Sequence, residues 1–478
     1  MTDREYDVIV IGAGSTGENV ADRAVKEGLC TVIVETELVG GDCSYWACMP
    51  SKALLRPFEA LAAARSVAGA REACLGQLSV ASVLARRDSF ASHWKDAGQV
   101  KWLRHSKIDL VRGHGRLAGE RRVVVTDSAG IATHLTARHA VAICTGSRAA
   151  IPTIPGLAET QPWTGREAAS SKRVPQSLAI LGGGVVACEM ATAWSQLGTS
   201  KLTVIQRGSR LIPNFEPFAS EMITEVLAQR GVTVLTGITT QRVERSSAGH
   251  VKLSLDNGQT VVAEEVLVAT GREPRTGDIG LETVGLIPGF WLAVDESMRV
   301  QGVPEGWLYA VGDVNRRALL THMGKYQARA CGDAIAARAL GKLDGAVPVP
   351  WSRYAATADT HGVPQVIFTD PEVAAVGLTE AQAKARGLNV RVADYDIGRV
   401  AGAALFADDY SGRARIVVDE MRNVIVGATL VGPAVGELIH AATIAVVGAV
   451  PIDRLWHAVP AYPTISEVWL RLLETLGR

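Results

Sequence analysis

The first fifty residues begin with a regular order of apolar and polar positions. An uninterrupted apolar run at 7–11 leads into a glycine-rich turn, a helical pattern over 18–27 and a second apolar run at 31–34. Uninterrupted apolar runs of this length are typical of parallel strands buried on both faces. The pattern predicts a strand, a helix and a second strand, which together form a βαβ unit.

The same order returns near the middle of the chain. An apolar run at 177–181 leads into another glycine-rich turn, a helix that ends near residue 197 and a strand at 201–206. Strands that alternate with helices are characteristic of α/β proteins. The sequence therefore predicts an α/β fold that contains two βαβ units.

Each turn places small residues where a helix begins. The candidate residues are Gly12, Gly14 and Gly17 in the first turn and Gly182, Gly184 and Ala187 in the second. Glycine lets the backbone approach a pyrophosphate, and a helix N-terminus offers unpaired N–H groups and the positive end of its dipole. A single copy of this motif is also what an ordinary tight turn looks like. Two copies, each between a strand and a helix, favour two dinucleotide sites.

The residues that end the second strand differ between the two units. Glu35 is placed to accept hydrogen bonds from a ribose diol, as in FAD or NAD. The second unit has Gln206 and Arg207 there, with Arg210 close behind. Because guanidinium groups bind a 2′-phosphate, this change favours NADPH over NADH, although both arginines are also compatible with solvated surface charges.

The segment between the two units carries a pair of cysteines. Cys43 and Cys48 are five residues apart, which on an ideal helix separates their Cα atoms by about 8 to 9 Å. A disulfide spans no more than ~7 Å, so a bridge requires irregular backbone, which the flanking glycines and proline permit. Lys52 would favour a nearby thiolate. A redox disulfide is the preferred interpretation, and a metal site or inert core thiols are the alternatives.

The remaining cysteines are scattered in apolar surroundings. They are Cys30, Cys74, Cys144, Cys188 and Cys331. We interpret them as packing residues, because free cysteine behaves as a small hydrophobic side chain.

Composition narrows the choice of partner and compartment. The chain has 478 residues, 47% hydrophobic and 21% charged, enough for about three globular domains. Lys plus Arg and Asp plus Glu are both 49, so no nucleic-acid partner is expected. The most apolar stretch, 438–452, is too short for a membrane span, and the N-terminal residues do not resemble a secretory signal. We expect a cytoplasmic protein that acts on a small molecule, with mostly reduced cysteines.

Taken in order, these motifs resemble those of the class I pyridine nucleotide-disulfide oxidoreductases, the flavoprotein family of dihydrolipoyl dehydrogenase, glutathione reductase and mercuric reductase. The resemblance extends over essentially the whole chain. It implies two Rossmann-like dinucleotide-binding domains, for FAD and NAD(P), plus a C-terminal α+β dimerisation domain, and hence a homodimer. The implied domains are a first FAD-binding part at 1–150, an NAD(P)-binding domain at 151–275, a second FAD-binding or central part at 276–345 and a dimer-interface domain at 346–478.

The resemblance also implies roles for individual residues. Cys48 would be the thiolate that faces the flavin, Cys43 would attack the acceptor, and Lys52 would pair with Glu189 beside the flavin. FAD would be held by Gly12, Gly14, Gly17, Glu35, Lys52, Gly115, Gly146, Asp313, Leu320, Thr321 and His322, and the nicotinamide nucleotide by Gly182, Gly184, Ala187, Arg207, Arg210 and Gly271. Electrons would then pass from NAD(P)H through FAD to the cysteine pair and on to a small acceptor.

The C-terminal segment departs from the family pattern. Members that handle dithiols have His-Pro-Thr followed by Glu, whereas this chain has Tyr462 before Pro-Thr and keeps Glu467. A phenol with an ordinary pKa of about 10 is a poor general base at pH 7. His457 is interpreted as structural. Mercuric reductases also have Tyr here, but no cysteine follows Cys331 in this sequence to capture the metal.

A second departure lies beside the cysteine pair. Asp42 stands where the family usually has Thr, and a carboxylate there would raise the pKa of the neighbouring thiol. The preferred function is an NAD(P)H-dependent flavin disulfide reductase that acts on a small disulfide or other acceptor. Two alternatives stay open: a diaphorase that reduces quinones or metal ions, and a flavin-containing redox sensor.

Overall fold

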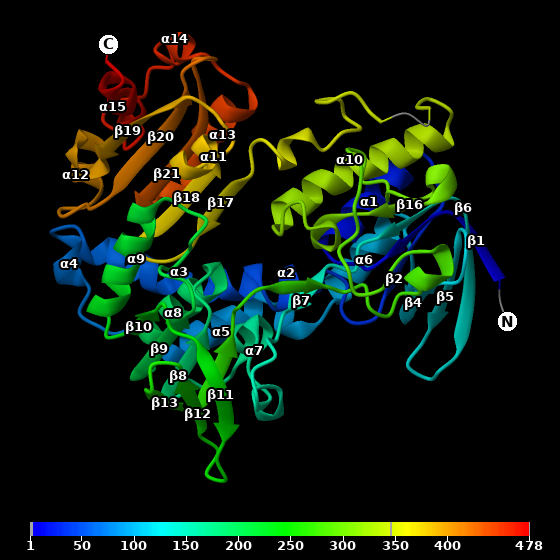
Figure 1. Ribbon diagram of the computed structural model, residues 1–478, viewed down its shortest axis with the longest axis horizontal. Coiled ribbons are helices and arrows are strands. Elements are labelled where there is room, and N and C mark those ends of the chain that lie inside the picture. The colour runs from blue at the N-terminus through cyan, green and yellow to red at the C-terminus, as the bar shows by residue number, and fades with distance from the viewer. Residues whose placement is uncertain (1–2, 345–346, 478) are drawn as a thin grey trace. The chain divides into compact units, whose positions relative to one another are not determined.

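The computed structural model describes residues 3–344 and 347–477 and divides into two compact units (Figure 1). Unit 1 comprises Met1–Pro50, Asp88–Ala149 and Arg272–Thr360, and unit 2 comprises Ser51–Arg87, Ala150–Gly271 and His361–Arg478. Each unit is thus assembled from three separate stretches of the chain. The divisions fall inside two helices, α3 (Cys48–Arg65) and α5 (Val80–Phe90), and at the chain crossovers near residues 150, 271 and 360.

Unit 1 is built on a mostly parallel sheet. Its strands are β1 (Asp3–Ile11), β2 (Thr31–Glu35), β3 (Asp109–Arg112), β4 (His114–Leu117), β5 (Arg122–Thr126), β6 (Ala132–Ile143) and β16 (Leu308–Ala310), with β7 (Ser147–Ala149) and β15 (Arg272–Pro274) as a separate antiparallel pair. Its helices are α1 (Ser15–Lys26), α2 (Gly41–Tyr45), α6 (Ala97–His105) and α10 (Thr321–Ala339), with short helical turns η1 (Ser92–Trp94), η3 (Leu281–Val284), η4 (Pro304–Gly306), η5 (Gly312–Asn315) and η6 (Thr357–Asp359). The strand order is β3-β2-β1-β6-β5-β4, and β16 also pairs with β6.

The central strand β1 is buried on both faces, as the sequence pattern predicts. Val8 and Val10 pack into one apolar cluster with α1 and α10, which lie side by side in Figure 1. Ile9 and Ile11 point to the opposite face and pack with residues of β4, β5 and β6. Successive side chains of a strand alternate between faces, so an uninterrupted apolar run fits a strand covered on both sides.

Unit 2 contains a second parallel sheet. Its strands β8 (Ser177–Leu181), β9 (Lys201–Gln206), β10 (Thr233–Thr236) and β14 (Glu265–Val268) follow the order β10-β9-β8-β14, and β11 (Thr240–Arg245), β12 (Val251–Leu255) and β13 (Thr260–Ala263) form an antiparallel sheet. The helices of this part are α3, α4 (Ala70–Ala73), α5, α7 (Gly165–Ser170), α8 (Val185–Leu197) and α9 (Pro217–Gln229), with the turn η2 (Ala158–Thr160). Leu178 and Ile180 face one core cluster, whereas Ala179 and Leu181 face another.

The C-terminal part of unit 2 is an antiparallel sheet with helices. The sheet order is β17-β18-β21-β20-β19, formed by β17 (Pro364–Ile367), β18 (Glu372–Gly377), β19 (Val390–Asp396), β20 (Arg413–Asp419) and β21 (Val424–Gly432). The helices are α11 (Glu380–Ala385), α12 (Ala401–Phe406), α13 (Val435–Val447), α14 (Ile452–Leu455) and α15 (Glu467–Thr475), with the turn η7 (Ile397–Arg399). In Figure 1 this part is coloured yellow to red.

The predicted elements are confirmed, with one change at a boundary. The strands at 177–181 and 201–206 coincide with β8 and β9, and the second helix ends at Leu197. The first helix, predicted from residue 18, begins at Ser15 instead. The difference arises because the third glycine, Gly17, lies inside the first helical turn rather than before it. The predicted fold class, with two parallel dinucleotide-type sheets and a C-terminal α+β part, is confirmed.

The predicted domain boundaries stay a prediction. Two compact units are observed, and the second joins the middle and C-terminal stretches of the chain. The predicted boundary between segments 276–345 and 346–478 falls at residues 345 and 346, which lie outside the described residues. Within the described residues, no helix is both long and apolar enough to cross a membrane.

Candidate functional site

The first glycine-rich turn of unit 1 is fixed by two close backbone contacts. Gly12 has a φ of +104°, and a Cβ there would lie 2.4 Å from the carbonyl oxygen of Cys144. A Cβ on Gly17 would lie 1.9 Å from the carbonyl oxygen of Gly12. No side chain larger than hydrogen fits at either position, so both glycines are required by the turn itself.

The other side of this turn is open. Gly14 is the N-cap of α1, no described side chain caps that helix end, and a Cβ on Gly14 would meet nothing closer than 4.0 Å. The hydroxyl of Thr145 is buried and has no hydrogen-bond partner among the described residues. An uncapped helix end with nearby unsatisfied polar groups fits a bound pyrophosphate. These residues are therefore compatible with the dinucleotide that the sequence predicts.

Glu35 ends β2 beside this turn. Its carboxylate accepts hydrogen bonds from the backbone N–H groups of Ala13 and Glu37, both at 2.7 Å. Burial raises the pKa of Glu35, and the two backbone donors oppose that shift. The carboxylate is thus held at the end of the strand, where the sequence predicts a ribose.

The second turn, in unit 2, repeats the construction of the first. Gly182 has a φ of +110°, and a Cβ there would lie 2.3 Å from the carbonyl oxygen of Ala269. Gly184 is the uncapped N-cap of α8, and a Cβ on it would meet no atom within 4 Å. Ala187 is fully buried in the helix that follows. Both turns therefore press a glycine against a chain crossover and leave a helix end open.

The end of β9 carries polar rather than acidic side chains. Gln206 packs against the turn, since a Cβ on Gly183 would lie 2.9 Å from its Cγ. Arg207 is exposed, and Arg210 donates to the carbonyl oxygen of Pro213 at 2.7 Å. The Nη1 atom of Arg210 is buried without a hydrogen-bond partner within residues 3–344 and 347–477. This guanidinium retains the capacity to donate to an anion.

The cysteine pair lies where two helices meet at an angle. Cys43 is in α2, which ends at Tyr45, and Cys48 begins α3. Between them Trp46 has a φ of −135°, which is not helical. Both cysteines are thiols, and the Cys43 side chain is hydrogen-bonded to that of Cys48. The broken helix brings together two thiols that a continuous helix would hold apart, as the sequence requires.

The surroundings of the pair shift the ionisation of Cys43. The hydrogen bond to Cys48 raises the pKa of Cys43, and burial and the negative charge of a Cys48 thiolate raise it further. Thr321 and the positive charge of Lys325 act in the opposite direction. The Oγ1 atom of Thr321 lies 3.2 Å from the Sγ atom of Cys48. A negative charge on Cys48 therefore opposes ionisation of Cys43, and a hydroxyl at the start of α10 lies beside Cys48.

The predicted effect of Asp42 on the thiol is not the main one. The largest causes of the shift at Cys43 are Cys48 and burial. The Asp42 carboxylate instead pairs with Arg272 and Arg275 at 3.7 and 3.8 Å. Opposite charges reduce the field of the carboxylate at its neighbours.

Asp313, predicted to bind the ribitol of FAD, lies in η5 of unit 1. Its carboxylate accepts a hydrogen bond from Ser147 at 2.6 Å and lies 3.6 Å from the Nε atom of Arg272. A Cβ on the preceding Gly312 would lie 2.8 Å from the hydroxyl oxygen of Thr16 at the start of α1. Unit 1 thus brings the second predicted FAD motif against the first.

The other predicted FAD positions in unit 1 are spread around the same sheet. Gly115 lies in β4, where a Cβ would approach Val34 to 3.0 Å. Gly146 has a φ of +70° in the crossover after β6. Leu320 is the N-cap of α10, and His322 is exposed on the first turn of that helix. Gly271, assigned to the nicotinamide nucleotide, has a φ of +148° and ends the middle stretch of unit 2.

Unit 2 contains the predicted ion pair between Lys52 and Glu189. The Nζ atom of Lys52 lies 2.7 and 3.0 Å from the two carboxylate oxygens, and Glu189 is buried in α8. The backbone N–H of Phe368 donates to the same carboxylate at 3.1 Å, and the ammonium lies 4.9 Å from the Phe368 ring centre. A backbone N–H on the carboxylate and an aromatic ring beside the ammonium therefore stabilise the ion pair.

The C-terminal candidates lie in unit 2. Tyr462 is 75% exposed and precedes a cis proline. Glu467 begins α15 and is buried, with one carboxylate oxygen 2.5 Å from the Nη2 atom of Arg471. Its other oxygen has no hydrogen-bond partner in the described part of the chain. His457 is exposed. In the single chain, the Glu467 carboxylate is thus oriented by Arg471, whereas dithiol-handling members of the family have a histidine before the Pro-Thr segment.

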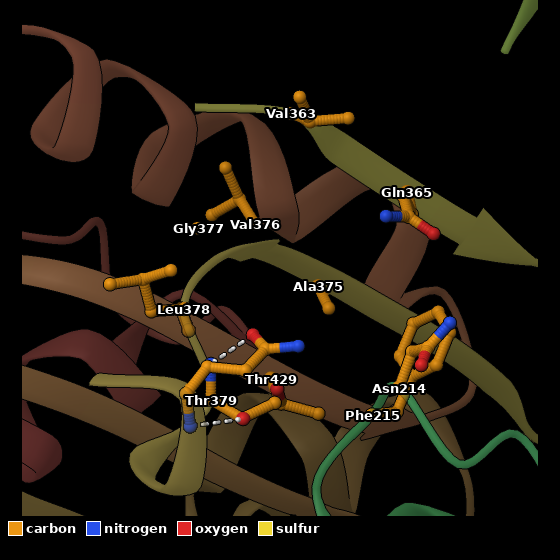
Figure 2. A pocket seen from close by; sticks show the side chains of 12 residues that line it. Asn214, Phe215, Val363, Gln365, Ala375, Val376, Gly377, Leu378, Thr379 and Thr429 are labelled. Atoms are coloured by element: carbon orange, nitrogen blue, oxygen red, sulfur yellow. Dashed lines mark hydrogen bonds between the residues drawn. The ribbon is translucent and has the colours of Figure 1, made fainter. Parts of the chain in front are cut away.

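A cavity of about 370 Å³ in unit 2 is lined by none of the predicted site residues. Figure 2 shows Asn214 and Phe215 on one side and Thr379 and Thr429 on another, with Gln365 pointing into the space. The side chains that line it are all neutral. Thr379 is the N-cap of the short helix α11, but its side chain and that of Gln382 already satisfy this helix end as a capping box. With no positive charge and no open helix end in its lining, the cavity does not suit a nucleotide phosphate.

Sequence reasoning missed several groups near the site. Lys325 acts on Cys43 and on Glu18, and burial raises the pKa of Glu18 to about 7. The signal for Lys325 was its spacing, because a residue four positions after Thr321 lies on the same face of a helix. Glu18 gave no signal, because the burial of its carboxylate depends on tertiary packing. The packing assignment of Cys30 was wrong, because this cysteine is exposed, whereas Cys144, Cys188 and Cys331 are buried and Cys74 is half-buried.

Comparison with known proteins identifies the architecture. Residues 6–328 match the family described as pyridine nucleotide-disulphide oxidoreductase, and residues 363–472 match the dimerisation domain of that family. This family implies FAD and a pyridine nucleotide as cofactors, and the dimerisation domain supports a homodimer.

Individual relatives agree with the family match. The chain is 31% identical over 469 residues to a mercuric reductase of Staphylococcus aureus, covering 97% of this chain and 81% of that protein. It is 31% identical over 479 residues to a dihydrolipoyl dehydrogenase of Bacillus subtilis, covering 97% and 96%. A Cu(II) complex of the HOCl-induced flavoprotein disulfide reductase RclA from Escherichia coli has the same fold, with a TM-score of 0.84, 21% identity and coverage of 99% and 100%. The chain belongs to the pyridine nucleotide-disulfide oxidoreductase family.

Proposed function

We propose that this protein reduces a small disulfide or another electrophilic acceptor with electrons from NADPH, using Cys43 and Cys48 as its redox pair. The observation that carries the proposal is the hydrogen-bonded thiol pair at the break between α2 and α3, with Thr321 at 3.2 Å from Cys48. This pair lies in the same unit as the first open glycine turn. A redox pair and a dinucleotide cradle in one unit suit a flavin disulfide reductase.

The residues of unit 1 fit FAD. Gly14 and the uncapped end of α1 would hold the pyrophosphate, Glu35 the ribose of the adenosine, and Asp313 the ribitol. When bound, FAD supplies two-electron transfer between a reduced nicotinamide and the cysteine pair. The protein contributes the positions of these groups and the charges around them.

The residues of unit 2 favour NADPH. Gly184 leaves the end of α8 open for the pyrophosphate, and Arg207 and Arg210 follow β9 in place of an acid. The buried Nη1 atom of Arg210 lacks a partner among the described residues. Binding of a 2′-phosphate would give this guanidinium an anionic acceptor.

The thiol chemistry follows from the different surroundings of the two sulfur atoms. Reduction of the disulfide consumes two electrons and one proton and yields a Cys43 thiol and a Cys48 thiolate. Cys43 then attacks one sulfur of the acceptor disulfide and passes its proton to the leaving sulfur, which forms a mixed disulfide and releases one thiol. The Cys48 thiolate attacks Cys43 and restores the Cys43–Cys48 disulfide, and the second leaving thiolate takes a proton from solvent. The hydroxyl of Thr321 stabilises Cys48 as a thiolate during this cycle.

Tyr462 sets the acceptor apart from those of dithiol-handling relatives. Its phenol is exposed in the single chain, and the resemblance to dithiol-handling relatives implies that the residue at this position serves the partner subunit. A phenol donates a hydrogen bond to a thiolate but is a weak base near pH 7. We therefore expect acceptors whose leaving thiol is already acidic, or acceptors other than disulfides.

An acceptor panel with the Cys48→Ser variant tests this function. The panel contains lipoamide, glutathione disulfide, mycothiol-type disulfides, mercury, copper and quinones, each supplied with NADPH. We expect the wild type to reduce at least one disulfide and the variant to lose that activity by at least about a hundredfold. Cys144→Ser, a buried cysteine in the same unit, is the matched control and should retain the activity.

The same panel separates the alternatives. If quinone or metal reduction is fast and survives in Cys48→Ser while no disulfide is reduced, the protein is a diaphorase. If no acceptor supports turnover, the protein is a redox sensor and not an enzyme. Either result contradicts the proposed function.

A further inference from the structure

Asp42 places a carboxylate at an unfavourable position. It lies in the first turn of α2, directly before Cys43. The backbone N–H of Gly40 donates to the carbonyl oxygen of Ala13 at 2.7 Å, and a Cβ on Gly41 would lie 2.8 Å from the Cα atom of Gly14. The segment that carries Asp42 is therefore pressed against the turn proposed to hold a pyrophosphate. An uncompensated carboxylate there would repel both the phosphates and a cysteine thiolate.

Two arginines face this carboxylate. The Nη2 atom of Arg272 lies 3.7 Å from one oxygen of Asp42, and the Nη2 atom of Arg275 lies 3.8 Å from the other. Arg275 also lies 3.9 Å from Glu37, and Arg272 lies 3.6 Å from Asp313. Three carboxylates thus share two guanidinium groups. Removal of one arginine would increase the excess of negative charge beside the phosphate turn.

Both arginines are anchored by the pairing of β7 with β15. Arg272 donates from Nε to the hydroxyl of Ser147 at 2.5 Å and from Nη2 to its carbonyl oxygen at 2.9 Å. The backbone N–H of Arg275 donates to the carbonyl oxygen of Gly146 at 3.1 Å, and its Nε donates to that of Ser147 at 3.3 Å. Anchored side chains lose less entropy when they form ion pairs than free surface arginines do. Their charges are therefore held beside Asp42.

We propose that Arg272 and Arg275 are positioning residues that neutralise Asp42, so that an anionic dinucleotide and a reduced cysteine pair can lie beside it. The inference rests on the proposed function, because it assigns the anion to FAD and the thiols to the redox pair.

Arg275 gives the cleaner test, because Arg272 also supports Asp313. We expect Arg275→Gln to weaken FAD binding about tenfold, the effect of losing one charge-assisted contact near a phosphate. Arg275→Lys, which keeps the charge, should lose less. In Asp42→Asn/Arg275→Gln, the affinity should return to within about twofold of Asp42→Asn alone, because the charge to be neutralised is gone. FAD affinity is measured by flavin fluorescence during titration of flavin-free protein.

A second readout follows the cysteines. The holoenzyme is equilibrated with a fixed ratio of reduced to oxidised glutathione, and the fractions of disulfide and dithiol are determined after alkylation. We expect Arg275→Gln to raise the ratio of disulfide to dithiol about threefold to tenfold, because reduction adds negative charge. Asp42→Asn should lower the ratio. If Arg275 had a purely structural role, Arg275→Gln and Asp42→Asn would not change the ratio of disulfide to dithiol in opposite directions.

Arg121→Gln is the matched control. Arg121 is 31% exposed and pairs with Glu120 and Glu305, whereas Arg275 is 34% exposed and pairs with Glu37 and Asp42. We expect this variant to change neither readout by more than about twofold. If Arg275→Gln does not fold, Asp42→Asn alone decides: weaker FAD binding or a higher disulfide fraction would overturn the inference.

The outcomes separate the inference from the function. If the wild type binds FAD and forms the disulfide, but the effects of Asp42→Asn and Arg275→Gln simply add, the neutralisation is disproved and the proposed function stands. If the wild type binds no FAD at all, the proposed function fails and this inference fails with it.

Discussion

Single residues in this protein owe their chemistry to neighbours from other parts of the chain. Cys48 raises the pKa of Cys43, and the hydroxyl of Thr321, which lies 273 residues later in the sequence, contacts Cys48. Glu18, in the first turn of α1, is half-buried, and one of its carboxylate oxygens is buried without a hydrogen-bond partner among the described residues. Such environments make the ionisation of a side chain depend on packing rather than on its type.

Glu18 should make stability depend on pH. Burial raises the pKa of Glu18 from 4.5 to about 7. Between these two values the unfolded chain ionises while the folded protein keeps the proton, so the free energy of unfolding falls as pH rises and stays low above about pH 7. The loss has an upper bound of about 3 kcal/mol.

The Glu18→Gln variant isolates this contribution. Because glutamine mimics the protonated side chain, we expect it to be more stable than the wild type by about 1 to 3 kcal/mol near pH 8. The two proteins should converge as pH falls toward about 4.5. Denaturant unfolding of flavin-free protein at several pH values measures the difference. A difference that does not vary with pH would show that Glu18 remains ionised in the folded protein.

The arginines after β9 should determine the choice of nucleotide. Replacing Arg207 and Arg210 by glutamine removes the positive charge proposed to meet the 2′-phosphate. We expect kcat/KM for NADPH to fall about tenfold to a hundredfold and kcat/KM for NADH to change less than about threefold. Steady-state kinetics with both nucleotides measure this. Equal losses for the two nucleotides, or a wild-type preference for NADH, would contradict the assignment.

At the scale of elements, the two glycine turns repeat one construction. Each begins with a glycine at positive φ pressed against the carbonyl oxygen of a crossover residue, Cys144 or Ala269. Each ends with an open glycine at the N-cap of a helix, Gly14 or Gly184. The first glycine therefore serves the fold, and the second serves the ligand.

Alanine at the two glycines of the second turn should separate these roles. In Gly182→Ala, the added Cβ would lie 2.3 Å from a carbonyl oxygen at a φ of +110°, so we expect a loss of stability of roughly 2 to 4 kcal/mol. In Gly184→Ala, φ is −82° and the space is open, so stability should change by less than about 0.5 kcal/mol.

Gly184→Ala should instead affect the nucleotide. Its methyl group would occupy the open side of the turn, and we expect KM for NADPH to rise about tenfold. Thermal unfolding and steady-state kinetics of both variants measure the two effects. Similar losses of stability in the two variants would contradict the distinction between a fold glycine and a ligand glycine.

At the scale of the whole molecule, each unit joins segments that are distant in sequence. In unit 2, Arg415 of β20 pairs with Glu216, the N-cap of α9, and with Glu380 and Asp394 at 2.8 to 3.3 Å. Glu216 also accepts a hydrogen bond from the backbone N–H of Glu380 at 2.7 Å. This network links the nucleotide-type part of unit 2 to its C-terminal sheet.

Removal of Arg415 should weaken unit 2. Glu216 is 2% exposed and would keep a buried charge without its guanidinium partner in Arg415→Met. We expect a loss of about 3 kcal/mol, seen as a lower Tm of the holoenzyme. Arg399→Met is the control, because Arg399 is 75% exposed and its pair with Asp396 is long, at 3.5 Å. Equal effects of the two substitutions would show that the network does not stabilise the unit.

Local pattern alone determined much of this protein. The two βαβ units could be predicted from uninterrupted apolar runs, helical spacing and glycine turns. These patterns involve residues close together in sequence, so they do not require knowledge of the tertiary structure. The same reasoning found the broken helix at the cysteine pair, since five residues of regular helix would hold Cys43 and Cys48 apart. It placed Lys52 beside Glu189 only through resemblance, because no local rule joins positions 137 residues apart.

Only the tertiary structure decided which charges meet. Asp42 looked unfavourable for the thiol in the sequence, and folding set Arg272 and Arg275 against it beside the paired strands β7 and β15, where the Arg272 side chain also donates to Ser147. Glu18 and Lys325 gained their influence in the same way, through the helices α1 and α10, which pack against each other. Electrostatic energy depends on distance and solvent exposure, and both are set by chain segments whose separation in sequence carries no information about their separation in space.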